Sequence, residues 1–170
     1  MPLPTESPRA FSNILCPIDF SDPSRAALQV AGDLAKDWGV RITVLYVHDP
    51  TMAGMEVVAF PGVSLDDLRA EIRNFAAKVL PAGRAAVRTT RYAAGIGNPA
   101  HEILKTAKKM RCDLIVMGSR GLGSVQKLLL GSTTDRVLRH ATVPVLAVRA
   151  QRKAKRHARK RGPRALRLAG

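Results

Sequence analysis

The sequence has few of the residues that mark secreted, membrane or metal-binding proteins. It contains two cysteines, Cys16 and Cys112, which are too far apart to form a metal or redox motif, and four histidines without ligand spacing. No apolar run reaches the ~18 residues that a membrane helix needs. The first residues lack the basic start and apolar segment of a secretion signal. We therefore expect a cytoplasmic protein with reduced cysteines, no membrane association and no metal bound by its own side chains.

Acidic residues are also scarce, and the charge is unevenly distributed. The 170 residues include 28 Lys and Arg but only 13 Asp and Glu, for a net charge of +15. Residues 151–170 hold nine of these basic residues and no acid, and removing them leaves +6 for the rest. This segment has too few apolar groups to fold alone. We predict a flexible N-terminus at 1–10, one folded domain at 11–149 and a basic disordered tail at 150–170.

Segments with strand-like and helix-like patterns alternate through the predicted domain. Such alternation implies a parallel sheet with helices on both faces, in which a ligand binds at the carboxyl ends of the strands. The spacing does not give the order of the strands in the sheet. We expect strands at 11–19, 40–47, 86–92 (the weakest pattern), 114–117 and 144–148, and helices at 22–38, 64–80, 98–107 and 132–140, the first capped by Asp22.

A glycine-containing stretch follows the fourth predicted strand. Gly118 and Gly121 come directly after the strand, and Gly131 precedes Ser132 at the start of the last predicted helix. Glycine lets a backbone approach a ligand closely, and a helix start offers free N–H groups to an anion. The stretch therefore fits a phosphate site, although Ser132 and Asp135 also fit a simple helix cap. Neither the Walker pattern nor the dinucleotide pattern fits, since the first lacks its lysine and the second its last glycine.

The spacing Gly-x2-Gly-x9-Gly-Ser resembles the nucleotide loop of the universal stress protein family, in its ATP-binding branch. Other segments resemble the same family, and together they span residues 11–149, whereas the basic tail is not part of the family pattern. The resemblance implies an α/β fold with a single doubly wound five-stranded parallel sheet, of order 3-2-1-4-5, and helices on both faces. The matching segments are ILCPIDFS at 14–21, VLYV at 44–47, DLIVMGSRG at 113–121 and TVPVLAV at 142–148.

By the same resemblance, one set of residues is expected to bind ATP. An aspartate at a strand end can accept hydrogen bonds from ribose hydroxyls or the adenine amino group. Apolar side chains can cover the base, while glycine N–H groups and hydroxyls reach the phosphates. Taken alone, Asp19 also fits a turn-capping residue, and Val47 and Met117 fit the core, so these alternatives remain open. The expected ATP-binding residues are Pro17, Asp19, Val47, Met117, Gly118, Gly121, Gly131, Ser132 and Thr133.

Catalysis has little support in the sequence. ATP hydrolysis needs a positioned water, an orienting group and charge neutralisation, and the chain has no Walker lysine and no second acidic motif. We assign no catalytic residue, and we expect magnesium only as an ion held through the phosphates. Three functions remain open: an ATP-binding regulator in stress response or signalling, a slow ATPase or phosphotransfer enzyme, and a nucleic-acid-binding or scaffold protein acting through the tail.

Two macromolecular partners are expected. The last predicted strand is apolar and begins with Pro144, which suits a sheet edge. An uncovered apolar edge favours pairing, and members of the resembled family commonly dimerise there, so we expect a homodimer through this strand. The basic segment 151–170 lacks aromatic residues for base stacking. We expect it to bind nucleic acid weakly and without sequence preference, through phosphates.

Overall fold

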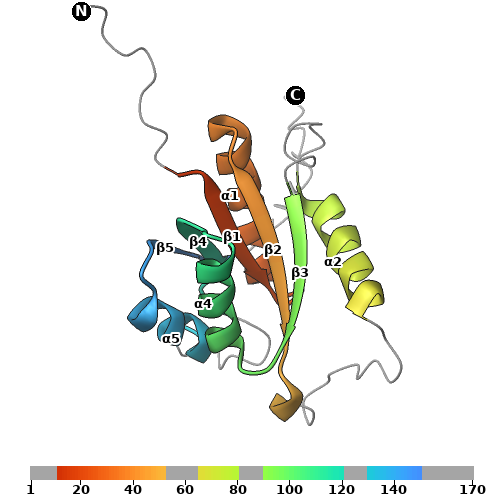
Figure 1. The fold of residues 1–170 in the computed structure, drawn as a ribbon. Helices are drawn as coiled ribbons and strands as arrows, with labels where there is room; N and C mark the ends of the chain where they lie inside the picture. The colour runs from red at the N-terminus through yellow and green to blue at the C-terminus, as the bar shows by residue number, and fades with distance from the viewer. Residues whose placement is uncertain (1–10, 53–64, 81–89, 121–129, 151–170) are drawn as a thin grey trace, which may run out of the picture.

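The structure is a computed structural model that describes residues 11–52, 65–80, 90–120 and 130–150. Its strands form one parallel sheet of order β3-β2-β1-β4-β5, which confirms the predicted order (Figure 1). None of the described helices is long and apolar enough to cross a membrane. The strands are β1 (Asn13–Ile18), β2 (Arg41–His48), β3 (Thr90–Ile96), β4 (Leu114–Gly118) and β5 (Val145–Val148). The helices are α1 (Asp22–Trp38), α2 (Leu65–Val79), α4 (Pro99–Lys109) and α5 (Ser132–His140), with a short 3-10 helix, η1 (Pro50–Met52).

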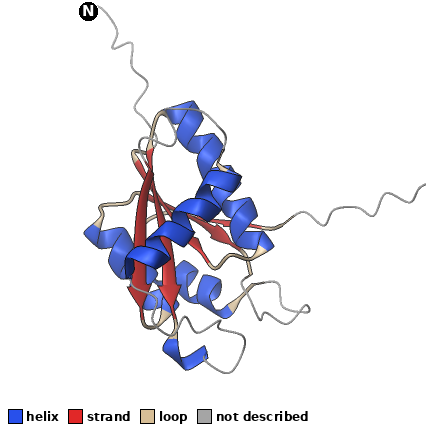
Figure 2. Cartoon of the chain, turned by 90° about the vertical axis from the view of Figure 1, so that its right-hand side faces the viewer, coloured by secondary structure: helices blue, strands red, loops and turns tan. Residues whose placement is uncertain are grey.

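Helices cover both faces of the sheet, and successive strand residues pack on opposite sides (Figures 1 and 2). Ile14 and Cys16 of β1 belong to the core beneath α1 and α2. Leu15, between them, belongs to a second core beneath α4 and α5. Every residue of β1 is buried, as expected for the central strand of a sheet that is covered on both faces.

The start of α1 corrects one expectation from the sequence. The N-cap is Ser21, which has the extended backbone that this position needs (φ −72°, ψ 164°), whereas Asp22 is already helical. The Ser21 hydroxyl accepts a hydrogen bond from the N–H of Ser24 at 3.3 Å. The helix ends at Gly39, whose φ of 62° is left-handed and therefore suits glycine.

The predicted strand at 86–92 was placed too early in the chain. The observed strand β3 runs from Thr90 to Ile96 and pairs along its length with β2, while residues 86–89 lie outside the described part. The strand includes Ala93, Ala94 and Gly95, and alanine and glycine are depleted in strands. Pairing with β2 therefore determines this strand more than local propensity does.

Asp113 joins the starts of β4 and β1, which lie about a hundred residues apart in the chain. One carboxylate oxygen accepts hydrogen bonds from the Ser12 N–H at 2.8 Å and the Ser12 hydroxyl at 2.6 Å. The other accepts from the Asn13 N–H at 2.9 Å. Burial alone would raise the pKa of Asp113, but these hydrogen bonds outweigh it and hold the pKa below its ordinary value.

We expect Asp113→Asn to lower the free energy of unfolding by about 1–2 kcal/mol, because the amide NH2 would face the Ser12 donors. The depressed folded-state pKa means that Asp113 stabilises the protein above the unfolded pKa of about 3.9. This contribution is lost as the pH falls through the lower folded-state pKa. Urea unfolding should therefore show a difference at neutral pH that shrinks below about pH 4.

Asp66→Asn is the matched control, since Asp66 is 87% exposed and, among the described residues, pairs across one helical turn with Arg69. It should change stability by less than about 0.5 kcal/mol. Equal effects of the two substitutions would show that Asp113 does not join the strands energetically.

Candidate functional site

The carboxyl ends of β2, β1 and β4 lie side by side, and several predicted site residues are found there. Asp19 directly follows β1, Val47 lies near the end of β2, and Gly118 ends β4. The winding direction of the sheet reverses between β1 and β4, which is where open α/β sheets bind ligands. Gly121 lies outside the described residues, and its role stays a prediction.

The first turn of α5 begins without a side-chain cap. Gly131 is the N-cap, and Ser132 is the first helical residue, so the alternative in which Ser132 and Asp135 cap the helix is wrong. The N–H groups of Ser132, Thr133 and Thr134 have no acceptor within the described residues. By contrast, side chains cap both α1 and α4. Three free N–H groups at the positive end of a helix dipole can bind an anion.

Hydrogen bonds fix the start of α5 against the ends of β4 and β5. The buried hydroxyl of Thr134 donates to the Gly118 carbonyl at 2.9 Å, and the Gly131 N–H donates to the Ser119 carbonyl at 2.8 Å. The Ser119 N–H in turn donates to the Val148 carbonyl at 2.7 Å. The free N–H groups of α5 are therefore held in a defined position beyond the end of the sheet.

Asp19 supports the turn between β1 and α1. Its Oδ1 accepts hydrogen bonds from the Ser21 N–H at 3.1 Å and from the Ser21 hydroxyl, so it has the turn-capping role that the sequence left open. The next residue, Phe20, has a φ of 63°, which is uncommon for a residue other than glycine. Ring contacts with Tyr46 and Phe75, at centroid distances of 5.1 and 5.2 Å, hold Phe20 in this conformation.

The charge of Asp19 also reaches a neighbouring side chain. The pKa of Tyr46 is raised, chiefly because burial disfavours the phenolate and further because the Asp19 carboxylate repels it. The neutral phenol is therefore strongly favoured at physiological pH. At the carboxyl end of the sheet, the Asp19 carboxylate therefore lies near the aromatic side chain of Tyr46.

The apolar site residues project toward the face covered by α4 and α5. Val47 and Met117 belong to that core, and Pro17 alternates with Cys16 and Ile18, which pack on the opposite face. Met117 is 4% exposed, which agrees with the core alternative, whereas Val47 is half-buried at the strand end and offers apolar surface. Contact of any of the three with a base stays a prediction.

Gly118 is required by packing as well as by its place in the candidate site. A Cβ on Gly118 would lie 2.9 Å from the carbonyl carbon of Pro23 and 3.0 Å from the Arg120 oxygen. Both neighbours are backbone atoms, which cannot move aside as a side chain could. The close approach of β4 to the first turn of α1 therefore selects glycine, independently of any phosphate.

Sequence reasoning missed Ser119 and Thr134 as site residues. Ser119 is 4% exposed and Thr134 2% exposed, and their backbone and hydroxyl groups position the first turn of α5. The run Gly131-Ser132-Thr133-Thr134 contained a signal for Thr134, because hydroxyl residues in a first helical turn often bond to nearby backbone. Ser119 acts through its backbone, which the side-chain type does not reveal.

Fold and site together define a doubly wound α/β domain with a candidate anion site at its switch point. The chain belongs to the universal stress protein family, whose sequence model matches residues 10–149. The universal stress protein YxiE of Bacillus subtilis is 35% identical over 149 residues, which cover 82% of this chain and 99% of that protein.

Solved structures share the fold. Universal stress protein UspA from Lactobacillus plantarum is 29% identical, with a TM-score of 0.63 over 81% of this chain and 97% of that one. A universal stress protein in complex with cAMP is 22% identical, with a TM-score of 0.59 over 84% of this chain and 99% of that one. The last likeness establishes the fold alone.

We expect Gly118→Ala to destabilise the domain by about 1–3 kcal/mol through overpacking against Pro23. Gly95→Ala in β3 is the matched control, because the atoms nearest to its Cβ would belong to the Glu102 side chain, the closest at an ordinary 3.6 Å. Urea unfolding of both variants without ligand measures the difference. If Gly118→Ala is as stable as Gly95→Ala, then packing does not require glycine here.

Proposed function

We propose that this protein binds ATP at the carboxyl ends of β1 and β4 and acts as a nucleotide-dependent regulator in the stress response. The uncapped first turn of α5 carries the proposal, because its three N–H groups lack acceptors within the described part of the chain. Their position at the switch point of the sheet and the family of the chain support a nucleotide as the ligand.

Each part of the nucleotide has a suitable group in this arrangement. The phosphates would bind the N–H groups of Ser132 and Thr133 and their hydroxyls, while the base and ribose would lie toward Val47 and Asp19. The acidic residue in the first turn of α5, Asp135, forms an ion pair with Arg139 at 2.9 Å. This pairing reduces the repulsion between Asp135 and phosphate. The described residues contain no group of three or more His, Cys, Asp or Glu that could hold a metal. We therefore expect magnesium to be held through the phosphates.

We expect Ser132→Pro to weaken ATP binding by about tenfold or more, because proline removes one donor to a charged phosphate. Proline is tolerated at the first helical position, and Gly131, with ψ of 154°, already has the extended backbone required before proline. Calorimetry on the full chain measures the affinity.

Ser132→Ala is the matched control, since it removes the same hydroxyl but keeps the N–H group. It should lose less affinity than Ser132→Pro. If the two variants bind ATP equally, or if the wild type binds none, the first turn of α5 does not bind the phosphates.

Two other functions have their own discriminating measurements. Steady phosphate release that a site substitution abolishes would favour a slow ATPase or phosphotransfer enzyme over a regulator. The nucleic-acid alternative rests on residues 151–170, which lie outside the described residues. Comparing DNA binding by the full chain and by a chain ending at Ala150, at two salt concentrations, tests that alternative.

We also propose a homodimer through β5. This strand lies at one edge of the sheet, and Leu146 on it is 41% exposed. An edge strand has unpaired backbone groups that favour pairing with another chain. Dimer formation through β5 would cover both this edge and its exposed apolar side chain.

We expect Leu146→Lys to shift the protein from dimer to monomer in sedimentation at micromolar concentration, because it places like charges at the paired edge. Ile96→Lys is the matched control, since Ile96 is 62% exposed on β3, at the opposite edge of the sheet. The β5 interface is wrong if wild type sediments as a monomer, or if the two variants shift the equilibrium equally.

A further inference from the structure

A groove lies between α4 and α5, on the face of the sheet that these helices cover. Its volume is about 440 Å³, and it is lined by Asn98, Ala100, His101, Leu104, Arg136 and His140. Leu104 is half-buried and supplies apolar surface, whereas Ala100 is only 2% exposed, and the remaining side chains are polar or basic. No acidic residue is among those lining the groove.

Arg136 is the strongest charge at the groove. Its guanidinium has no ion-pair partner within the described residues. Two acids adjoin groove-lining residues in sequence, and both are paired with basic residues that do not line the groove: Asp135 with Arg139 at 2.9 Å, and Glu102 with Lys105 at 3.1 Å. The Glu102 side chain lies against Gly95 and Gly97 of the β3 end. The positive charge of the groove is therefore not neutralised by these acids.

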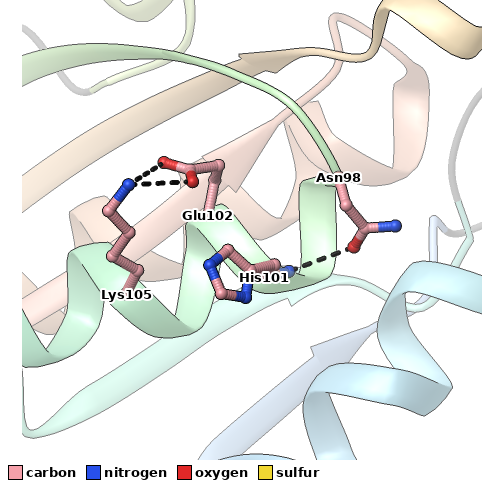
Figure 3. A network of polar contacts seen from close by, with 4 residues as sticks. All are labelled: Asn98, His101, Glu102 and Lys105. Atoms are coloured by element: carbon pink, nitrogen blue, oxygen red, sulfur yellow. Dashed lines mark hydrogen bonds and ion pairs between the residues drawn. The ribbon is translucent and has the colours of Figure 1, made fainter.

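Both histidines line the groove, and the His140 ring is held by its own helix. His140 Nδ1 lies 2.8 Å from the Arg136 carbonyl oxygen. Because that oxygen can only accept, Nδ1 carries the hydrogen of this bond. The backbone N–H of His101 donates to Asn98 Oδ1 at 3.2 Å, a bond that caps the start of α4 (Figure 3). Figure 3 shows the Lys105 ammonium directed toward Glu102 and not toward the His101 ring.

We propose that this groove binds an acidic segment of a partner protein. An aliphatic side chain of the partner packs on Leu104, and an adjacent carboxylate pairs with Arg136, with the histidines flanking it. Charge complementarity identifies this occupant, since basic rim residues around an apolar floor match an aliphatic residue next to an acid. The proposal does not depend on nucleotide binding.

The probe is the blocked peptide acetyl-Glu-Leu-Glu-Leu-Glu-amide, titrated into the full chain without nucleotide, with its glutamine counterpart as the neutral comparison. Affinity is measured by calorimetry, and the ring resonances of His101 and His140 are followed by NMR. We expect the acidic peptide to shift both resonances and Arg136→Gln to weaken its binding about fivefold, the range of an exposed ion pair.

Lys108→Gln is the matched control, because it removes one positive charge from α4 at a residue that does not line the groove and has no ion pair within the described residues. It should weaken binding less than twofold, and the basic tail is unchanged in both variants. Equal losses in the two variants, or binding without shifts of the histidine resonances, would assign the peptide to general charge attraction and overturn the proposal. Equal resonance shifts with inorganic phosphate or butyrate at the same concentration would also overturn it, in favour of a small-anion site.

Discussion

The hydrogen bonds between the end of β4 and the start of α5 are the constraint on which the candidate site depends. The Thr134 hydroxyl donates to the Gly118 carbonyl, and the Gly131 N–H donates to the Ser119 carbonyl. These two bonds fix the position of the helix start relative to the sheet. Ser119 extends the same connection to β5 through Val148. The proposed phosphate site and the proposed dimer edge therefore share a backbone connection.

Packing explains why the same residues serve both structure and site. Gly118 is required because a Cβ at this position would overlap the backbone of Pro23. Asp19 accepts hydrogen bonds from Ser21 in the turn that starts α1. Both residues lie where β1 and β4 end. The packing that closes the core at this point therefore also shapes the candidate site. A substitution at either position would change stability and binding together, which is why binding tests at Ser132, an exposed residue, are more informative.

Much of the fold could be predicted from the sequence, because alternating strands and helices with capping residues are local signals. The order of the strands came from family resemblance, since spacing does not determine which strands pair. The start of β3 was misplaced because its alanines and glycine carry little strand propensity. The role of Ser119 could not be predicted, because backbone hydrogen bonds between elements depend on the three-dimensional path. The groove between α4 and α5 likewise arises from packing of distant segments.

The bonds between Asp113 and the start of β1 have a consequence for how the chain folds. They join Ser12 and Asp113 across a separation of 101 residues. Contacts of such high sequence separation require closure of a long loop and slow the formation of a fold. Because β1 lies between β2 and β4, the candidate site is complete only after this long-range pairing has formed. A ligand that requires both β1 and β4 can therefore stabilise only those states of the chain in which these two strands have already paired.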